Sequence, residues 1–119
     1  MSDSIFTKII RGDIPSYKIL ENENFISFLD INPIKEGHTL VVPKLQVDYI
    51  YDLPNDVFTG LFNFSKIVAQ KLKRAIECDR IGISVVGLEV PHAHIHLIPI
   101  SQISDMSFEN HRIHLSQIE

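Results

Sequence analysis

Most links between the β-rich segments of this chain are too short to form the crossover connection that two parallel strands require. A parallel connection needs about a dozen residues or more, whereas only a few residues separate the first three segments from one another and the fourth from the fifth. Neighbouring segments within each group must therefore run antiparallel. The segments are residues 17–20, 25–31, 38–43, 80–87 and 93–100.

Two helices are predicted beside these strands. Residues 53–78 repeat apolar side chains at every third or fourth position, as expected for a long helix with one buried face. Residues 4–11 predict a short N-terminal helix, which Gly12 can end in the left-handed conformation. We therefore expect an α+β fold in which an antiparallel sheet of about five strands carries the long helix on one face. The length suits one domain spanning residues 1–119.

Composition narrows the partners and the compartment. The net charge is −4 and the basic residues are scattered, which argues against nucleic acid as a partner. A single cysteine, Cys78, excludes an intramolecular disulfide and a cysteine metal site, as expected in a reducing cytoplasm. The first fifteen residues lack the pattern of a signal peptide, and no apolar run is long enough for a membrane span. We expect a soluble cytoplasmic protein with no membrane partner.

Three of the six histidines, His92, His94 and His96, alternate with apolar residues in the segment PHAHIHLIPI. In a strand they would share one face, while the apolar residues between them would point to the core. The histidines would then face a cleft or solvent. A merely solvated face is an alternative, but three neighbouring imidazoles repel one another when protonated, and this favours a function for them.

The residues alone leave two functions open. Two of the three histidines could bind a metal together with Glu89 or His38. His92 and His96 could not share one ion, because residues four apart in a strand are separated by about 13 Å. Alternatively, one imidazole attacks phosphorus and its neighbours handle protons, because histidine with a pKa of about 6.5 is mostly neutral at pH 7.

The same residues resemble a known family. Residues 92–98 fit the His-φ-His-φ-His-φ-φ signature of the histidine triad (HIT) nucleotide hydrolases and transferases, where φ is apolar. The segments IFTKIIRGDIPS and FLDINPIKEGHTLVVPK resemble the N-terminal half of that family, so the resemblance covers about residues 5–100. It implies a HIT-like fold and a nucleotide site without a cofactor.

The resemblance also implies roles for the four histidines. His94, the middle histidine, resembles the nucleophile that forms a nucleotidyl intermediate. His96 resembles the residue that contacts the phosphate and the leaving group, and His92 the one that orients the nucleophile. His38 is similar to the fourth histidine that the family places beside the triad.

The nucleotide-binding residues follow from the resemblance as well. Asp30 resembles the carboxylate that accepts hydrogen bonds from the ribose, although alone it would be interpreted as a turn residue. Four apolar residues resemble the slot that holds the base, and each would also suit the core. Gly87 and Glu89 lie where the family binds the phosphate. The apolar residues are Phe6, Ile9, Phe28 and Ile31.

Two departures from the family pattern are visible. Many relatives hold a structural zinc with two cysteines and a histidine at positions occupied here by Ser4, Thr7 and Gln46, so we expect no metal. The phosphate-binding loop is shorter, and Glu89 replaces the usual serine. A carboxylate beside a phosphate is unfavourable, so we hypothesise that Glu89 lies at the leaving-group side and favours an amine.

These observations predict a hydrolase of nucleoside phosphoramidates or nucleotidylated amines, with a purine nucleotide as the ligand. Alternatives are a dinucleoside polyphosphate hydrolase, a regulatory nucleotide-binding module and the metal site. The resemblance implies a homodimer, and an apolar edge strand at residues 40–42 would need covering. The tail, residues 101–119, is not interpreted, and His111 and His114 are assigned no role.

Overall fold

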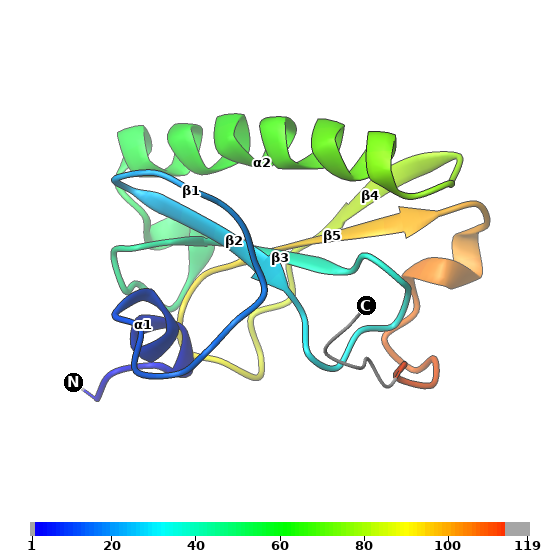
Figure 1. Ribbon diagram of the computed structural model, residues 1–119. Coiled ribbons are helices and arrows are strands. Elements are labelled where there is room, and N and C mark those ends of the chain that lie inside the picture. Colours follow the sequence, from blue (N-terminus) through cyan, green and yellow to red (C-terminus); the bar gives the residue numbers. More distant parts are fainter. Residues whose placement is uncertain (1, 114–119) are drawn as a thin grey trace.

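The computed structural model describes residues 2–113 (Figure 1). Five strands form one sheet in the order β1-β2-β3-β5-β4, and every neighbouring pair is antiparallel. The predicted α+β fold, with one long and one short helix, is confirmed. The helices are α1 (Ile5–Ile10) and α2 (Asn55–Ala75), the short 3₁₀ helices are η1 (Ile50–Asp52) and η2 (Ile103–Met106), and the strands are β1 (Lys18–Glu21), β2 (Phe25–Leu29), β3 (Thr39–Pro43), β4 (Arg80–Ser84) and β5 (Ile95–Ile100).

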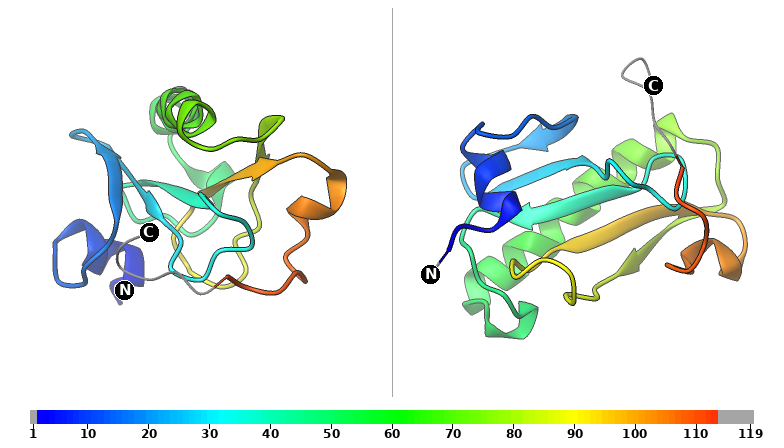
Figure 2. Two further views of the ribbon diagram at one scale, coloured as in Figure 1. Left: turned by 45° about the vertical axis from the view of Figure 1, so that its right-hand side comes forward. Right: turned by 90° about the horizontal axis from the view of Figure 1, so that it is seen from below.

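The helix α2 covers one face of the sheet, and α1 lies on the opposite face (Figures 1 and 2). The apolar repeat of α2 buries Leu61, Phe64, Val68 and Leu72 against the sheet, as the sequence period predicts. On the other face, α1 packs Phe6 against a second apolar cluster from β2 and β3. The sheet is therefore covered on both faces, with its central strands buried.

The alternation of β5 distributes its side chains between these two faces. Ile95 and Leu97 belong to the core beneath α2. His96 pairs with Leu40 of β3, and directly paired residues share a face, so His96 points to the side of α1. This register sets an imidazole beside the apolar cluster of Phe6 and Phe28.

The strand with the histidines begins later than predicted. β5 starts at Ile95 instead of residue 93, so His92 and His94 precede the paired segment. The backbone N–H of His92 donates to Val90 and that of Ala93 donates to Val47, which bends the chain after Pro91. The alternation of side chains nevertheless continues through these residues. Ala93 lies in the core beneath α2 with Ile95 and Leu97, whereas the Phe6 ring of α1 contacts both His92 and His94. The other predicted elements differ from the observed bounds by a few residues at their ends.

The prediction of an apolar edge at residues 40–42 is wrong. β3 lies between β2 and β5, and Val41 and Val42 are completely buried. The edge strands are β1 and β4. Exposed apolar side chains occur instead on or just after β4, at Ile83, Val85 and Val86. Within residues 2–113, no helix is long and apolar enough to cross a membrane.

Candidate active site

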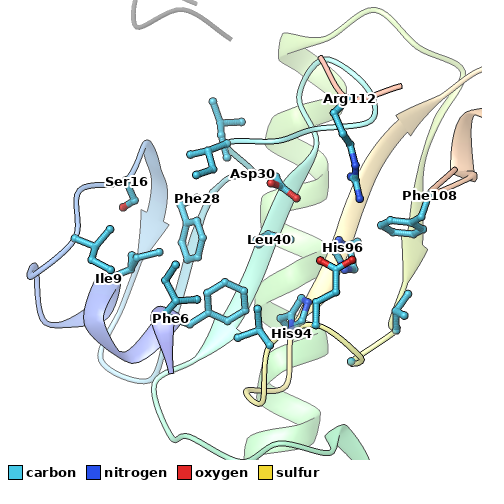
Figure 3. A pocket seen from close by; sticks show the side chains of 18 of the residues that line it. Phe6, Ile9, Ser16, Phe28, Asp30, Leu40, His94, His96, Phe108 and Arg112 are labelled. Carbon is cyan, nitrogen blue, oxygen red and sulfur yellow. The ribbon is translucent and has the colours of Figure 1, made fainter. Parts of the chain in front are cut away.

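The four predicted histidines are buried together on the α1 side of the sheet. His38 and His92 have no exposed surface, and His94 and His96 are 5% and 8% exposed. His94 and His96 line a cavity of about 290 Å³ (Figure 3), and the other two histidines are not among the residues that line it. A merely solvated polar face is therefore excluded.

A pair of hydrogen bonds determines the tautomer of His38 and then that of His96. The backbone N–H of Ile34 donates to His38 Nδ1 over 3.2 Å, so this nitrogen carries a lone pair and Nε2 carries the proton. His38 Nε2 lies 2.9 Å from His96 Nδ1 and donates to it. The neutral His96 therefore carries its own proton on Nε2. His96 can present an N–H donor to a ligand.

His94 has the opposite tautomer. Its Nδ1 lies 2.8 Å from the carbonyl oxygen of His92, and because a carbonyl only accepts, His94 Nδ1 must donate. Nε2 of His94 is therefore unprotonated and has a free lone pair. The ring of Phe6 contacts His94 edge to face, with 4.9 Å between the ring centroids, and fixes its orientation. His94 thus presents a nucleophilic nitrogen.

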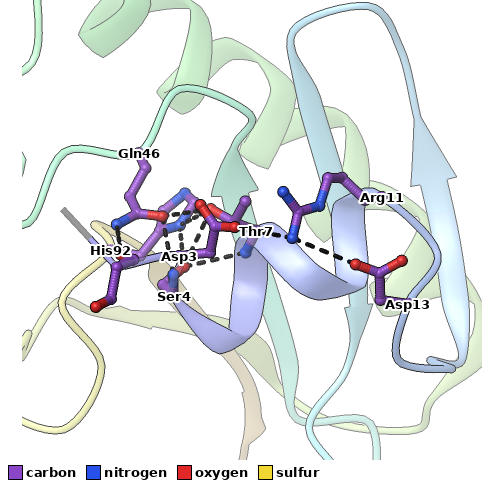
Figure 4. A network of polar contacts seen from close by, with 8 residues as sticks. Asp3, Ser4, Thr7, Arg11, Asp13, Gln46 and His92 are labelled. Atoms are coloured by element: carbon purple, nitrogen blue, oxygen red, sulfur yellow. Dashed lines mark hydrogen bonds and ion pairs between the residues drawn. The ribbon is translucent and has the colours of Figure 1, made fainter.

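His92 does not line the cavity but supports the residue that does. Its Nε2 donates to the Pro43 carbonyl over 2.7 Å. Its Nδ1 accepts from Ser4 Oγ over 2.6 Å (Figure 4). The ring is held at both nitrogens, and the backbone carbonyl of the same residue holds His94. His92 therefore contacts the His94 ring through its backbone carbonyl.

Burial keeps the imidazoles neutral. It lowers the pKa of His96 to about 3 and that of His38 to about 4, since a charged ring loses its hydration in the interior. Burial also lowers the pKa of His94 and of His92. At pH 7 the cavity therefore contains uncharged histidines, one with a free lone pair and one with a free N–H.

The cavity has an apolar end and a polar end. Phe6, Ile9 and Phe28 line the apolar end, and Ile31 stands at the rim with 74% of its surface exposed. Figure 3 shows these rings on one side of His94 and His96 and the residues Phe108 and Arg112 on the other. A cavity of this size is near the lower end of small-ligand sites, which range from about 300 to 1,000 Å³.

Asp30 lies at the boundary between the two ends. One carboxylate oxygen accepts from the Asn32 backbone N–H over 2.8 Å, which is the predicted turn. The other lies 3.6 Å from His38 Nε2. Asp30 also lines the cavity, so its turn role and a ligand role are compatible.

Phe108 and Arg112 were not predicted as site residues. The Phe108 ring lies with its centroid 4.8 Å from that of His96 and 6.1 Å from that of His38. Both residues come from a polar tail without periodicity, so the sequence offers no local signal for them. His111, in the same segment, is exposed and outside the cavity, and His114 lies outside the described residues.

A family model for the HIT domain matches residues 11–103. The chain belongs to the HIT family. It is 38% identical over 104 residues to the protein hit of Bacillus subtilis, covering 80% of this chain and 69% of that one. It is 36% identical over 100 residues to adenosine 5'-monophosphoramidase HNT1 of Saccharomyces cerevisiae, covering 80% of this chain and 61% of that one. The crystal structure of SMU.412c from Streptococcus mutans UA159 superposes with a TM-score of 0.82 at 35% identity, covering 99% of this chain and 78% of that one.

The positions at which many HIT proteins bind zinc form a hydrogen-bond network here. Thr7 Oγ1 donates to Gln46 Oε1 over 2.6 Å, the Ser4 backbone N–H donates to the same oxygen over 2.9 Å, and Ser4 Oγ contacts His92 (Figure 4). Zinc prefers thiolate, imidazole and carboxylate ligands, and His92 alone offers one. Both of its ring nitrogens are already engaged. These residues do not fit the family's zinc.

A second metal interpretation also disagrees with the geometry. Among residues 2–113 one group, Asp30, His38 and His96, brings three ligand-type atoms within 4.8 Å of one another. However, the lone pair of His38 Nδ1 is taken by the Ile34 N–H, so Nε2 is a proton donor and has no lone pair for a metal. The contact between the two rings is a hydrogen bond that can relay a proton.

The loop before the triad contributes two of its predicted residues to the cavity. Gly87 adopts a φ of +76°, a left-handed conformation that glycine enters without strain, and lines the cavity together with Glu89. Glu89 is exposed at the rim, and its charge acts against burial by raising the pKa of His94.

Proposed function

We propose that this chain hydrolyses nucleoside phosphoramidates or nucleotidylated amines through a covalent nucleotidyl intermediate on His94. The observation that carries the proposal is the pair of opposite tautomers at one cavity. His94 offers a lone pair from Nε2, and His96 offers a proton from Nε2. A nucleophile beside a proton donor is what cleavage of a phosphorus–nitrogen bond requires. The relationship to the yeast adenosine 5'-monophosphoramidase supports the substrate class.

In the first step, His94 Nε2 attacks the α-phosphorus while the phosphorus–nitrogen bond of the substrate breaks. The leaving nitrogen takes the Nε2 proton of His96, and the amine departs. His94 gains a positive charge as its imidazole becomes bonded to phosphorus, and this charge opposes the negative charge left on the His96–His38 pair. The two charges form together, so this step does not change the net charge of the site.

In the second step, water attacks the phosphorus of the nucleotidyl-His94 and the bond to Nε2 breaks. The water proton returns to Nε2 of His96, and His94 regains its neutral form. The products are the nucleoside monophosphate and the free amine. Donors around the phosphate stabilise the charge on its non-bridging oxygens in both steps.

The cavity suggests how the nucleotide lies. The apolar end, with Phe6, Ile9 and Phe28, suits a purine base, and Asp30 suits the ribose hydroxyls as an acceptor. Glu89 at the rim favours an amine leaving group. The same charge disfavours the alternative of a dinucleoside polyphosphate, whose leaving group is a polyanion.

Turnover of matched substrates tests this proposal. The purified protein is incubated with adenosine monophosphoramidate or with diadenosine tetraphosphate, each in the presence of a chelator, and AMP release is measured. We expect release from the phosphoramidate, with the chelator having no effect. Faster release from the polyphosphate would overturn the leaving-group assignment. AMP binding without turnover of either substrate would favour a regulatory nucleotide-binding module.

A homodimer remains part of the proposal. The exposed apolar residues near the edge strand β4, namely Ile83, Val85 and Val86, provide a surface that a second copy could cover. Light scattering on the eluting protein would measure the mass in solution. A monomer at micromolar concentration would contradict this assembly.

A further inference from the structure

The cavity contains one fixed positive charge. Among the described residues that line it, Arg112 is the only lysine or arginine. The histidines do not contribute charge at pH 7, because burial lowers the pKa of both His94 and His96. A bound nucleotide would bring at least one negative charge into this space. Its electrostatic partner must come from Arg112 or from neutral donors.

The loop before the triad offers no side chain to take that role. Between Val85 and Pro91 the single polar side chain is Glu89, whose carboxylate repels a phosphate. The backbone N–H groups of this loop remain as neutral donors. The positive charge must therefore be supplied from another part of the chain.

Arg112 is held in position by contacts from two sides. Its Nη1 donates to the Asn32 carbonyl over 3.1 Å, and the next residue, Ile113, donates its backbone N–H to Pro33 over 2.7 Å. The guanidinium carbon lies 5.7 Å from the centroid of the Phe108 ring. These contacts tie the tail across the loop after Asp30.

The guanidinium is directed toward the reacting groups. Figure 3 shows the Arg112 side chain extending into the cavity toward His96, with Phe108 beside it. The positive charge is close enough to contribute to lowering the pKa of both His38 and His96. A guanidinium has five N–H donors, and one hydrogen bond from Arg112 is seen within residues 2–113. Donors are thus left for a ligand.

We propose that Arg112 binds the phosphate of the nucleotide and takes over the phosphate recognition that the shortened loop does not provide. This inference rests on the proposed nucleotide site. A guanidinium suits the role because its planar donors match two phosphate oxygens. The tail is then part of the binding site, and removing the Arg112 charge weakens phosphate recognition specifically.

Calorimetric binding of AMP and of adenosine separates phosphate recognition from the rest of the site. The Arg112→Gln variant should bind AMP about 10- to 100-fold more weakly than the wild type, as expected for the loss of a hydrogen bond to a charged group. Adenosine affinity should be unchanged. Arg112→Lys keeps the charge and loses the planar arrangement of donors. Its AMP affinity should lie between that of the wild type and that of Arg112→Gln. Arg74→Gln, on the exposed side of α2, removes the same charge elsewhere and should have no effect.

The outcomes are distinguishable. If AMP and adenosine affinities fall together in Arg112→Gln, the residue only holds the tail in place, and the inference is overturned. Unchanged AMP affinity in that variant would overturn it too. A selective loss of AMP binding supports the inference even when no phosphoramidate is turned over, in which case the proposed reaction fails alone. If the wild-type protein binds neither AMP nor adenosine, both the inference about Arg112 and the proposed nucleotide site are overturned.

Discussion

His38 Nε2 and His96 Nδ1 lie 2.9 Å apart in the interior, and the hydrogen bond between them determines which nitrogen of His96 holds a proton for the cavity. His38 is itself fixed by the Ile34 N–H. The Ile34 N–H therefore donates to His38, His38 donates to His96, and His96 is left with an N–H that can donate to the ligand. Loss of the first ring would leave His96 free to adopt the other tautomer.

Replacing His38 by Phe should lower kcat about 10- to 100-fold for a phosphoramidate, as part of the roughly 10²- to 10⁴-fold effect of a positioned proton donor. Stopped-flow or discontinuous assays of AMP release measure this decrease in kcat. The decrease should be much smaller for a substrate whose leaving group needs no proton, such as an adenylyl fluoride. Equal losses for both substrates would show that His38 does not act through the proton of His96.

Asp30 provides a test of ribose recognition. Asp30→Asn keeps the shape and an oxygen that can accept from the Asn32 N–H. It removes a charge from the cavity, so affinity for AMP should fall about 10-fold, as for one hydrogen bond to a charged acceptor. Affinity for 2',3'-dideoxy-AMP should change little. A similar loss for both nucleotides would assign Asp30 to the turn alone.

Ser4 should stabilise the fold through His92. Ser4→Ala removes the donor to the buried His92 Nδ1 and the acceptor for the Thr7 N–H at the start of α1. An unsatisfied buried acceptor and a lost helix cap together predict a decrease of about 2 kcal/mol or more in the free energy of unfolding. Urea denaturation measures this decrease. Ser104→Ala, at an exposed serine, is the matched control and should change stability by less than about 0.5 kcal/mol.

The pKa values of the buried histidines predict loss of stability in acid. Below pH 6.5 the unfolded chain binds protons, whereas folded His38 and His96 do not until the pH approaches about 4 and about 3. The free energy of unfolding should therefore fall as the pH is lowered from 6.5 toward 4. At pH 5 each ring should contribute about 2 kcal/mol to this loss.

Urea denaturation at pH 7 and pH 5 measures the acid sensitivity. His96→Gln should show a smaller difference between the two pH values than the wild type. His111→Gln removes an exposed histidine and serves as the control that should match the wild type. A wild-type protein equally stable at both pH values would contradict the burial argument.

The elements could be predicted where their signal is local. The apolar period of α2 describes a single buried face, so Leu61, Phe64 and Val68 could be placed in the core from sequence. The strand order could not, because β5 returns between β3 and β4 through contacts between distant residues. For that reason the apolar pattern alone predicts an edge position for β3, which is in fact a central strand.

The site was predictable to the same extent. The spacing of His94 and His96 predicted side chains facing one cleft, and both line the cavity. His92 does not line the cavity, because Ser4 and Pro43 engage its two ring nitrogens, and no alternation pattern contains those contacts. Arg112 could not be predicted from sequence because its position depends on contacts with Phe108 and with Asn32, which lies eighty residues earlier.

The central claim is that His94 becomes covalently nucleotidylated, and a quenched single turnover tests it most directly. The protein is mixed with adenosine monophosphoramidate, quenched under alkaline conditions that preserve phospho-imidazole, and its peptides are sequenced by mass spectrometry. In the wild-type protein we predict one adenylyl group on His94. The His94→Ala variant should carry no adenylyl group and should release no AMP. AMP release by His94→Ala at the wild-type rate, or an adenylyl group on a different residue, would contradict the account.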